Sequence, residues 1–166
     1  SYDLLNRNTG TTYNINGSQT RSVEMIYDGA VNGKGRLHYE RTQEGGINAT
    51  ETKIDSYDAL GRPLNKQQSF WRGSDWGTPY DIQQSYDLAG AVKTVTYPSD
   101  RKVNYGYDQA GRLNSFTGNL GDGVNRNYAT GMQYDAAGSM KREQFGTTIP
   151  LYHRRHYNNL GQLFDI

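Results

Sequence analysis

A short motif, Tyr-Asp-x-x-Gly-x-Leu, recurs along this chain and constrains its fold more than any other feature. Its copies lie at residues 27–37, 57–64, 86–92, 107–113, 134–140 and 157–163. The copy at 107–113 is complete, that at 157–163 carries Asn158 for Asp, and that at 27–37 reaches its glycine across an enlarged loop. Because the motif is tight while the spacing of the copies is loose, we interpret each copy as the turn of one structural repeat.

Each motif position has a physical role in a reverse turn. The aspartate can accept hydrogen bonds from main-chain N–H groups further along the turn, and asparagine can do the same without charge. The glycine supplies the left-handed conformation that closes the turn, often with a bulge. The predicted turn residues are Asp28 and Gly35, Asp58 and Gly61, Asp87 and Gly90, Asp108 and Gly111, Asp135 and Gly138, and Asn158 and Gly161.

The tyrosine of each motif is expected to lie on a strand that leads into the turn. We predict a structural ladder of these side chains, made by Tyr27, Tyr57, Tyr86, Tyr107, Tyr134 and Tyr157. A further Tyr-Asp pair, Tyr2-Asp3, lacks the glycine and resembles a decayed first copy.

The segments that flank the motifs alternate between apolar and polar residues. Val103, Tyr105 and Tyr107 alternate before one motif, and Val92, Thr94 and Thr96 after another, which is typical of half-buried antiparallel strands. No segment shows a helical period. The sequence therefore predicts an all-β fold of repeated antiparallel hairpins in a curved open sheet, with residues 1–166 as a single array of about six copies. Open sheets leave unpaired edges, so we expect flanking repeats or self-association to cover them.

The composition favours a thin, partly solvated sheet over a globule with one aliphatic core. Leu, Ile, Val and Phe together make 28 of 166 residues, below the roughly 20% level associated with disorder. The net charge of only +1 is not the charge of a disordered chain, and 14 tyrosines supply the missing apolar area. This charge also argues against a nucleic-acid partner, and no apolar run is long enough to span a membrane.

The motif and the stretch from Thr94 to Leu113 resemble the RHS or YD-repeat family of bacterial polymorphic toxins, insecticidal toxin complex C components and teneurin-like proteins. This resemblance implies a segment of a β-shell that encloses a toxin polypeptide or presents a surface, in a secreted or cell-surface bacterial protein. It also implies flanking repeats in a longer parent chain. We expect no signal peptide in this sequence. Some family members cleave themselves at a motif that contains Asp-Pro, and because no proline follows an aspartate here, we do not expect this chain to cleave itself.

An aromatic loop is the main candidate for a binding site. Phe70, Trp71, Trp76 and Tyr80 could stack against a carbohydrate or a partner protein, although the simpler interpretation is that this loop folds back and caps the sheet. The repeated aspartates are interpreted as turn residues and not as a catalytic pair, so we expect no enzyme activity. We also expect no cofactor and no metal, because His153 and His156 would face opposite sides of a strand.

Overall fold

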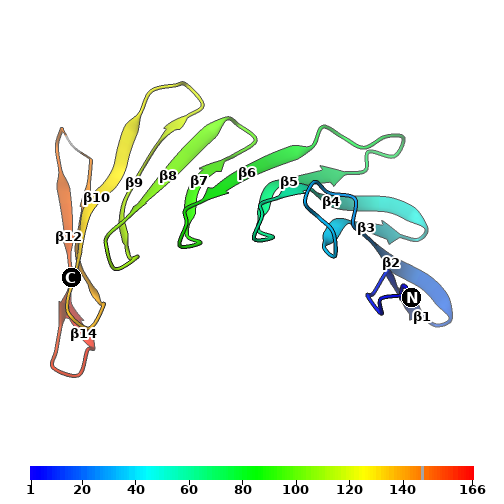
Figure 1. Cartoon of the computed structure of the whole chain (residues 1–166), viewed down its shortest axis with the longest axis horizontal. Coiled ribbons are helices and arrows are strands. Elements are labelled where there is room, and N and C mark those ends of the chain that lie inside the picture. Colours follow the sequence, from blue (N-terminus) through cyan, green and yellow to red (C-terminus); the bar gives the residue numbers. More distant parts are fainter. Residues whose placement is uncertain (147) are drawn as a thin grey trace. The chain divides into compact units, whose positions relative to one another are not determined.

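The computed structural model describes residues 1–146 and 148–166. These residues form strands and no helix, and within β1 to β6 and within β7 to β12 each strand pairs antiparallel with the next strand along the chain (Figure 1). This confirms the predicted all-β fold of hairpins in an open sheet. The strands are β1 (Gly10–Ile15), β2 (Ser18–Tyr27), β3 (Leu37–Glu44), β4 (Ile47–Tyr57), β5 (Pro63–Phe70), β6 (Tyr80–Tyr86), β7 (Val92–Thr96), β8 (Arg101–Tyr107), β9 (Leu113–Leu120), β10 (Arg126–Tyr134), β11 (Met140–Phe145), β12 (Leu151–Arg154), β13 (His156–Tyr157) and β14 (Leu163–Asp165).

The chain divides into two compact units, Ser1–Gln84 and Ser85–Ile166. In the first unit, β1 to β5 and most of β6 pair with their neighbours in the chain. The turns at Asn16-Gly17 and Gly45-Gly46 have positive φ at both residues, as the tight turns that match the twist of antiparallel strands require. Short connections of this kind explain why consecutive strands become neighbours.

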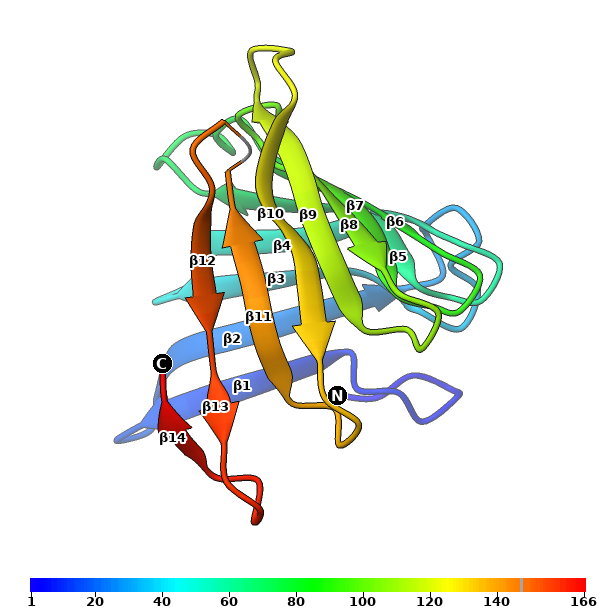
Figure 2. The same cartoon turned by 90° about the vertical axis from the view of Figure 1, so that its left-hand side faces the viewer.

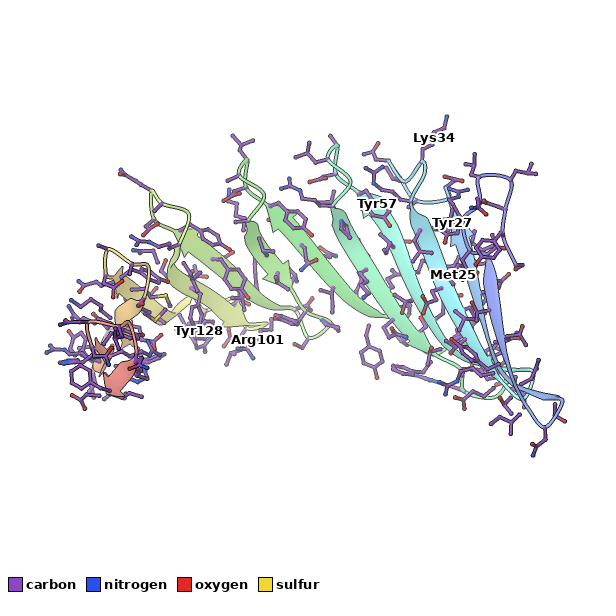
Figure 3. All side chains as sticks on the ribbon, turned by 90° about the horizontal axis from the view of Figure 1, so that it is seen from below. Met25, Tyr27, Lys34, Tyr57, Arg101 and Tyr128 are labelled. Atoms are coloured by element: carbon purple, nitrogen blue, oxygen red, sulfur yellow. The ribbon has the colours of Figure 1, made fainter. Side chains whose placement is uncertain are left out.

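The enlarged loop after Tyr27 adds a parallel bridge to the first unit. Val31 pairs with Ser56 next to the end of β4, its N–H donates to the carbonyl of Asp55, and its own carbonyl accepts from the N–H of Tyr57, both at 2.9 Å. Lys34, at the tip of this loop, points away from the sheet (Figure 3). The insertion therefore satisfies main-chain groups beside a motif turn, where they would otherwise need water.

In the second unit, β7 to β12 continue the same pattern, and β13 and β14 form a separate two-stranded hairpin (Figure 2). Residues directly opposite each other on paired strands share a face. One face carries an apolar row of Tyr105, Phe116 and Ala129, whereas the neighbouring row on the other face carries Asn104 and Thr117.

Buried side chains are few, because each unit is a single layer of strands (Figures 1 and 2). The buried apolar residues of the described chain are Ala30, Tyr57, Val95, Val103, Ala129 and Met132. No large side chain among the described residues is fully buried. Main-chain ladders and tyrosine contacts, and not a central aliphatic core, hold these strands.

Candidate functional site

The turn at Asp108 shows the geometry of the repeated motif. The N–H of Asp108 donates to the carbonyl of Arg112 at 2.8 Å, and the N–H of Gly111 donates to the carbonyl of Asp108 at 2.9 Å. The carboxylate oxygen Oδ1 of Asp108 accepts from the N–H groups of Ala110 and Arg112, both at 2.9 Å. Gly111 has a φ of 76°, which a side chain with a Cβ rarely adopts.

The same pair of main-chain bonds closes the turns that begin at four other predicted residues. These are Asp58, Asp87, Asp135 and Asn158, and in each the side-chain Oδ1 accepts from the N–H four residues later. The turn at Asp28 differs because of its enlarged loop. Asp28 itself has a φ of 71°, and its Oδ1 accepts from the N–H of Gly35 at 2.5 Å. All six predicted motif glycines have positive φ.

A seventh turn of this kind lies at Asp3, in the copy that lacks glycine. Asn6 takes the glycine position with a φ of 59°, and its N–H donates to the carbonyl of Asp3 at 3.0 Å. The N–H groups of Leu5 and Arg7 donate to Oδ1 of Asp3. The first copy is therefore intact as a turn, which sequence reasoning missed. The available signal was that asparagine tolerates the left-handed region better than most residues.

The motif tyrosines link successive turns through their hydroxyl groups. In five copies the hydroxyl donates to the main-chain carbonyl of the residue that stands two places after the glycine position of the preceding motif. The pairs are Tyr27 with Asn8, Tyr57 with Leu37, Tyr107 with Val92, Tyr134 with Leu113 and Tyr157 with Met140, at 2.7, 2.6, 2.8, 2.7 and 3.0 Å. Tyr86 is half-buried at the end of β6.

A register irregularity accompanies these tyrosines. The strand pairing shifts at Tyr27, Tyr57, Tyr107, Tyr134 and Tyr157, as in a β-bulge. Figure 3 shows Tyr27 and Tyr57 close to the strand ends that carry the motif turns. The hydroxyl of Tyr27 also lies 3.8 Å from the sulfur of the labelled Met25. A bulge re-aims the side chain that follows it, and here that side chain is the tyrosine.

An arginine directly after the glycine position joins two motifs, and sequence reasoning missed this role. The Nε of Arg112 donates to Oδ2 of Asp108 at 2.8 Å, while its guanidinium carbon lies 4.7 Å from the ring centre of Tyr134 in the next motif. Arg7 does the same with Asp3 and Tyr27. The recurrence of arginine after the motif glycine was the available sequence signal.

Hydrogen bonds and burial in the motif turns shift the pKa values of aspartates and tyrosines there. Main-chain hydrogen bonds from Arg62 and Arg112 lower the pKa of Asp58 and Asp108, respectively. Asp28 has its pKa lowered to about 2, chiefly by its hydrogen bond from the side chain of Arg7. Burial raises the pKa of Tyr134, which favours the neutral hydroxyl that donates to Leu113. The ionised aspartates and neutral tyrosines are therefore the forms that fit this site.

The aromatic loop does not bring its four predicted residues into one cluster. Trp71 and Trp76 form an edge-to-face pair with ring centres 5.4 Å apart, and Arg41 lies over Trp76 at 5.5 Å. Phe70 and Tyr80 form a second edge-to-face pair at 6.0 Å. Because Phe70 and Trp71 are consecutive and side chains alternate along a strand, the two pairs belong to different faces.

His153 and His156 make different contacts. His153 contacts the carboxylate of Glu143 at 3.0 Å, and His156 packs edge-to-face on Phe164. Among the described residues no group of three histidine or acidic side chains has the arrangement of a metal site. No helix long and apolar enough to cross a membrane occurs in the described part of the chain.

The antiparallel hairpins joined by Tyr-Asp turns define a class of all-β repeat proteins, and the comparisons with known proteins name a family within it. Residues 86–122 match the family model described as RHS Repeat, which confirms the resemblance that the motif suggested. This segment holds two of the predicted turns, those at Asp87 and Asp108. The comparison with curated proteins gave no match.

Solved structures of toxin complexes share the fold. The crystal structure of TcdB2-TccC3 matches with a TM-score of 0.60 and 17% identity, and the same protein without its hypervariable C-terminal region with 0.62 and 18%. The Photorhabdus luminescens Tc holotoxin pore, with a TccC3 variant, matches with 0.61 and 17%. Each match covers 93% of this chain but only 10% of the other chain. At this identity the likeness concerns the fold alone.

Proposed function

We propose that this chain is a non-catalytic structural module, in which each Tyr-Asp turn locks one hairpin to the next and residues 1–166 act as one array. The observation that carries the proposal is the repeated bond from a motif tyrosine to the outgoing strand of the preceding motif, which recurs at five copies. A bond that crosses from one repeat to the next stabilises the array and not merely a single turn.

The larger setting that we infer is a sheet wall in a secreted or cell-surface bacterial protein. In this proposal the module is continued by flanking repeats of a longer parent chain, and the wall encloses a toxin polypeptide or presents an interaction surface. Support comes from the RHS Repeat match at 86–122 and from the shared fold with chains about ten times longer in TcdB2-TccC3. Unpaired groups at the sheet edges would be covered by those repeats or by self-association.

Protease protection tests the enclosing role. The full parent chain, with the polypeptide that follows its repeats, would be treated with a non-specific protease before and after substitution of Tyr57, Tyr107 and Tyr134 by phenylalanine. We expect the downstream polypeptide to resist digestion in the native parent and to be cut faster in the triple variant. Equal and rapid digestion of both proteins would refute enclosure while leaving the structural role of the ladder testable by stability.

A second candidate function is carbohydrate or protein binding by the aromatic loop. The observation that favours it is the exposure of Phe70 and Tyr80, at 51% and 56%, because large exposed aromatic rings supply stacking surface. Trp71 and Trp76 are less exposed, and Arg41 lies over the ring of Trp76. If a ligand stacks here, the Phe70 and Tyr80 pair is its platform.

A comparison of two double variants tests this candidate. Phe70→Ala with Tyr80→Ala should abolish retention on a glycan array or on a partner protein, whereas Trp71→Phe with Trp76→Phe should leave it intact. An unmodified chain that retains no glycan and no protein would eliminate the candidate.

A further inference from the structure

A basic groove in the second unit carries chemistry that the turns do not use. It has a volume of about 470 Å³, within the range of pockets that hold small organic ligands. Its lining contains four lysine or arginine residues and His156, together with Gln133, Tyr157 and Phe164, and no carboxylate. The groove therefore presents positive charge beside aromatic surface.

Two arginines stand directly opposite each other in this groove. Arg142 on β11 pairs with Arg154 on β12, and Gln133 on β10 pairs with Arg142 from the other side, so the three residues form one row on one face. Like charges directly opposite on neighbouring strands are unfavourable. An anion held between the two guanidinium groups would reverse this unfavourable interaction.

The acidic residue next to Arg142 in the sequence does not neutralise this pair. Glu143 follows Arg142 in β11, so its side chain belongs to the opposite face, where its carboxylate accepts from Arg155 at 2.8 Å and contacts His153 at 3.0 Å. Glu143 therefore forms its salt bridge with Arg155. Arg142 and Arg154 form no salt bridge to a carboxylate among the described residues.

The side chain of Arg142 is held in place by an aromatic ring. Its guanidinium carbon lies 4.3 Å from the ring centre of Tyr152. Its Nε is buried and has no hydrogen-bond partner among the described residues. Because this Nε is buried, a carboxylate in the groove would bind the terminal nitrogens of the guanidinium, which stacking on Tyr152 holds in a fixed orientation.

We propose that this groove binds an acidic peptide segment, with a glutamate or aspartate carboxylate between Arg142 and Arg154 and an apolar side chain against Tyr157 and Phe164. A peptide fits better than a small inorganic anion because the groove is far larger than one oxyanion and is partly aromatic. This inference rests on the groove alone and does not require the enclosing role proposed above.

The test is a calorimetric titration of the full chain with two matched peptides. The probes are acetyl-Glu-Glu-Phe-Glu-Glu-amide and its glutamine counterpart, acetyl-Gln-Gln-Phe-Gln-Gln-amide. We expect the acidic peptide to bind at least about tenfold more tightly, and the difference to shrink as salt screens the charges. Equal affinity of the two peptides, or no binding by either, would overturn the proposal.

Single variants identify the arginines. Arg142→Gln and Arg154→Gln should each weaken binding of the acidic peptide about tenfold, whereas Lys102→Gln, which removes a positive charge from β8, should not. Arg154 is exposed, so its variant is expected to fold even if the half-buried Arg142 proves necessary for stability. Unchanged affinity in Arg154→Gln would contradict the assignment.

Inorganic phosphate separates a peptide groove from a small-anion site. We expect phosphate to compete only weakly with the acidic peptide. If phosphate alone binds as tightly as the peptide and with the same dependence on Arg142 and Arg154, the site takes small oxyanions and the peptide proposal fails.

Discussion

The hydroxyl of Tyr134 donates to the main-chain carbonyl of Leu113 at 2.7 Å, and this bond joins the turn at 134–140 to the strand that leaves the turn at 107–113. The guanidinium of Arg112 lies over the ring of Tyr134, and the Nε of Arg112 donates a hydrogen bond to the carboxylate of Asp108. One tyrosine thus connects two motifs by a hydrogen bond and by a cation–ring contact.

Removal of the Tyr134 hydroxyl should destabilise the chain. Tyr134→Phe keeps the ring and loses the bond to Leu113, so we expect the free energy of unfolding to fall by about 1 kcal/mol. Tyr13→Phe is the matched control, because Tyr13 is 53% exposed. Urea unfolding followed by circular dichroism measures both. Equal losses in the two variants would mean that the hydroxyl bond contributes nothing specific.

Substitution at Gly111 should be costly for reasons of backbone conformation alone. A Cβ at this position would meet no atom within 4 Å, yet φ is 76°. We expect Gly111→Val to cost about 1–3 kcal/mol and Gln109→Ala to cost much less. Gly111→Asn should fall between them, because Asn6 occupies the equivalent position in the first copy. Melting temperatures that do not follow this order would argue against strain at the motif glycine.

An arginine placed where one motif lacks it should be stabilising. Ser139 occupies the position of Arg112 in the motif at 134–140, and its N–H already donates to Oδ1 of Asp135. Ser139→Arg is expected to raise stability by about 0.5–1 kcal/mol, through a contact with Asp135 and with the ring of Tyr157. Ser139→Gln adds length without charge and should give little. A gain that is equal in the two variants would show that the charge is irrelevant.

Acid should destabilise the chain through its turn aspartates. The folded-state pKa of Asp28 is about 2, below its ordinary value of 3.8, and hydrogen bonds also lower the pKa of Asp3, Asp58 and Asp108. The unfolded chain therefore binds protons more readily, so stability is present above the ordinary pKa and is lost as pH falls through the folded-state values. We expect the urea midpoint to drop between about pH 5 and pH 2.

Asp28→Asn isolates one contribution to this acid dependence. Asparagine tolerates the positive φ of this position and keeps an oxygen for the N–H of Gly35, but loses the charge that pairs with Arg7. The variant should be less stable than the native chain at pH 7 and nearly equal to it at pH 2. A constant difference across this range would exclude ionisation of Asp28 as the cause.

The turns and hairpins could be predicted from the sequence because each motif acts within a few consecutive residues. Glycine and aspartate act within a few residues of each other, so Tyr-Asp-x-x-Gly sufficed to predict hairpins and the all-β class. The turn at Asp3 was not predicted because Asn6 stands where the motif has glycine, although Asn6 adopts the same left-handed conformation. The family resemblance likewise followed from the motif, and the match at 86–122 confirms it.

What only the tertiary structure decided is how parts distant in the chain meet. The sequence places Tyr134 far from Leu113, and no spacing rule indicates that its hydroxyl reaches that carbonyl. Strand register separates Phe70 and Tyr80 from Trp71 and Trp76, and it sets Arg142 opposite Arg154. The hydrogen bonds and backbone conformations of a turn involve only a few consecutive residues, so the local sequence predicts them. Strand register depends on the bulges and loop lengths of every hairpin together, so the local sequence does not predict it.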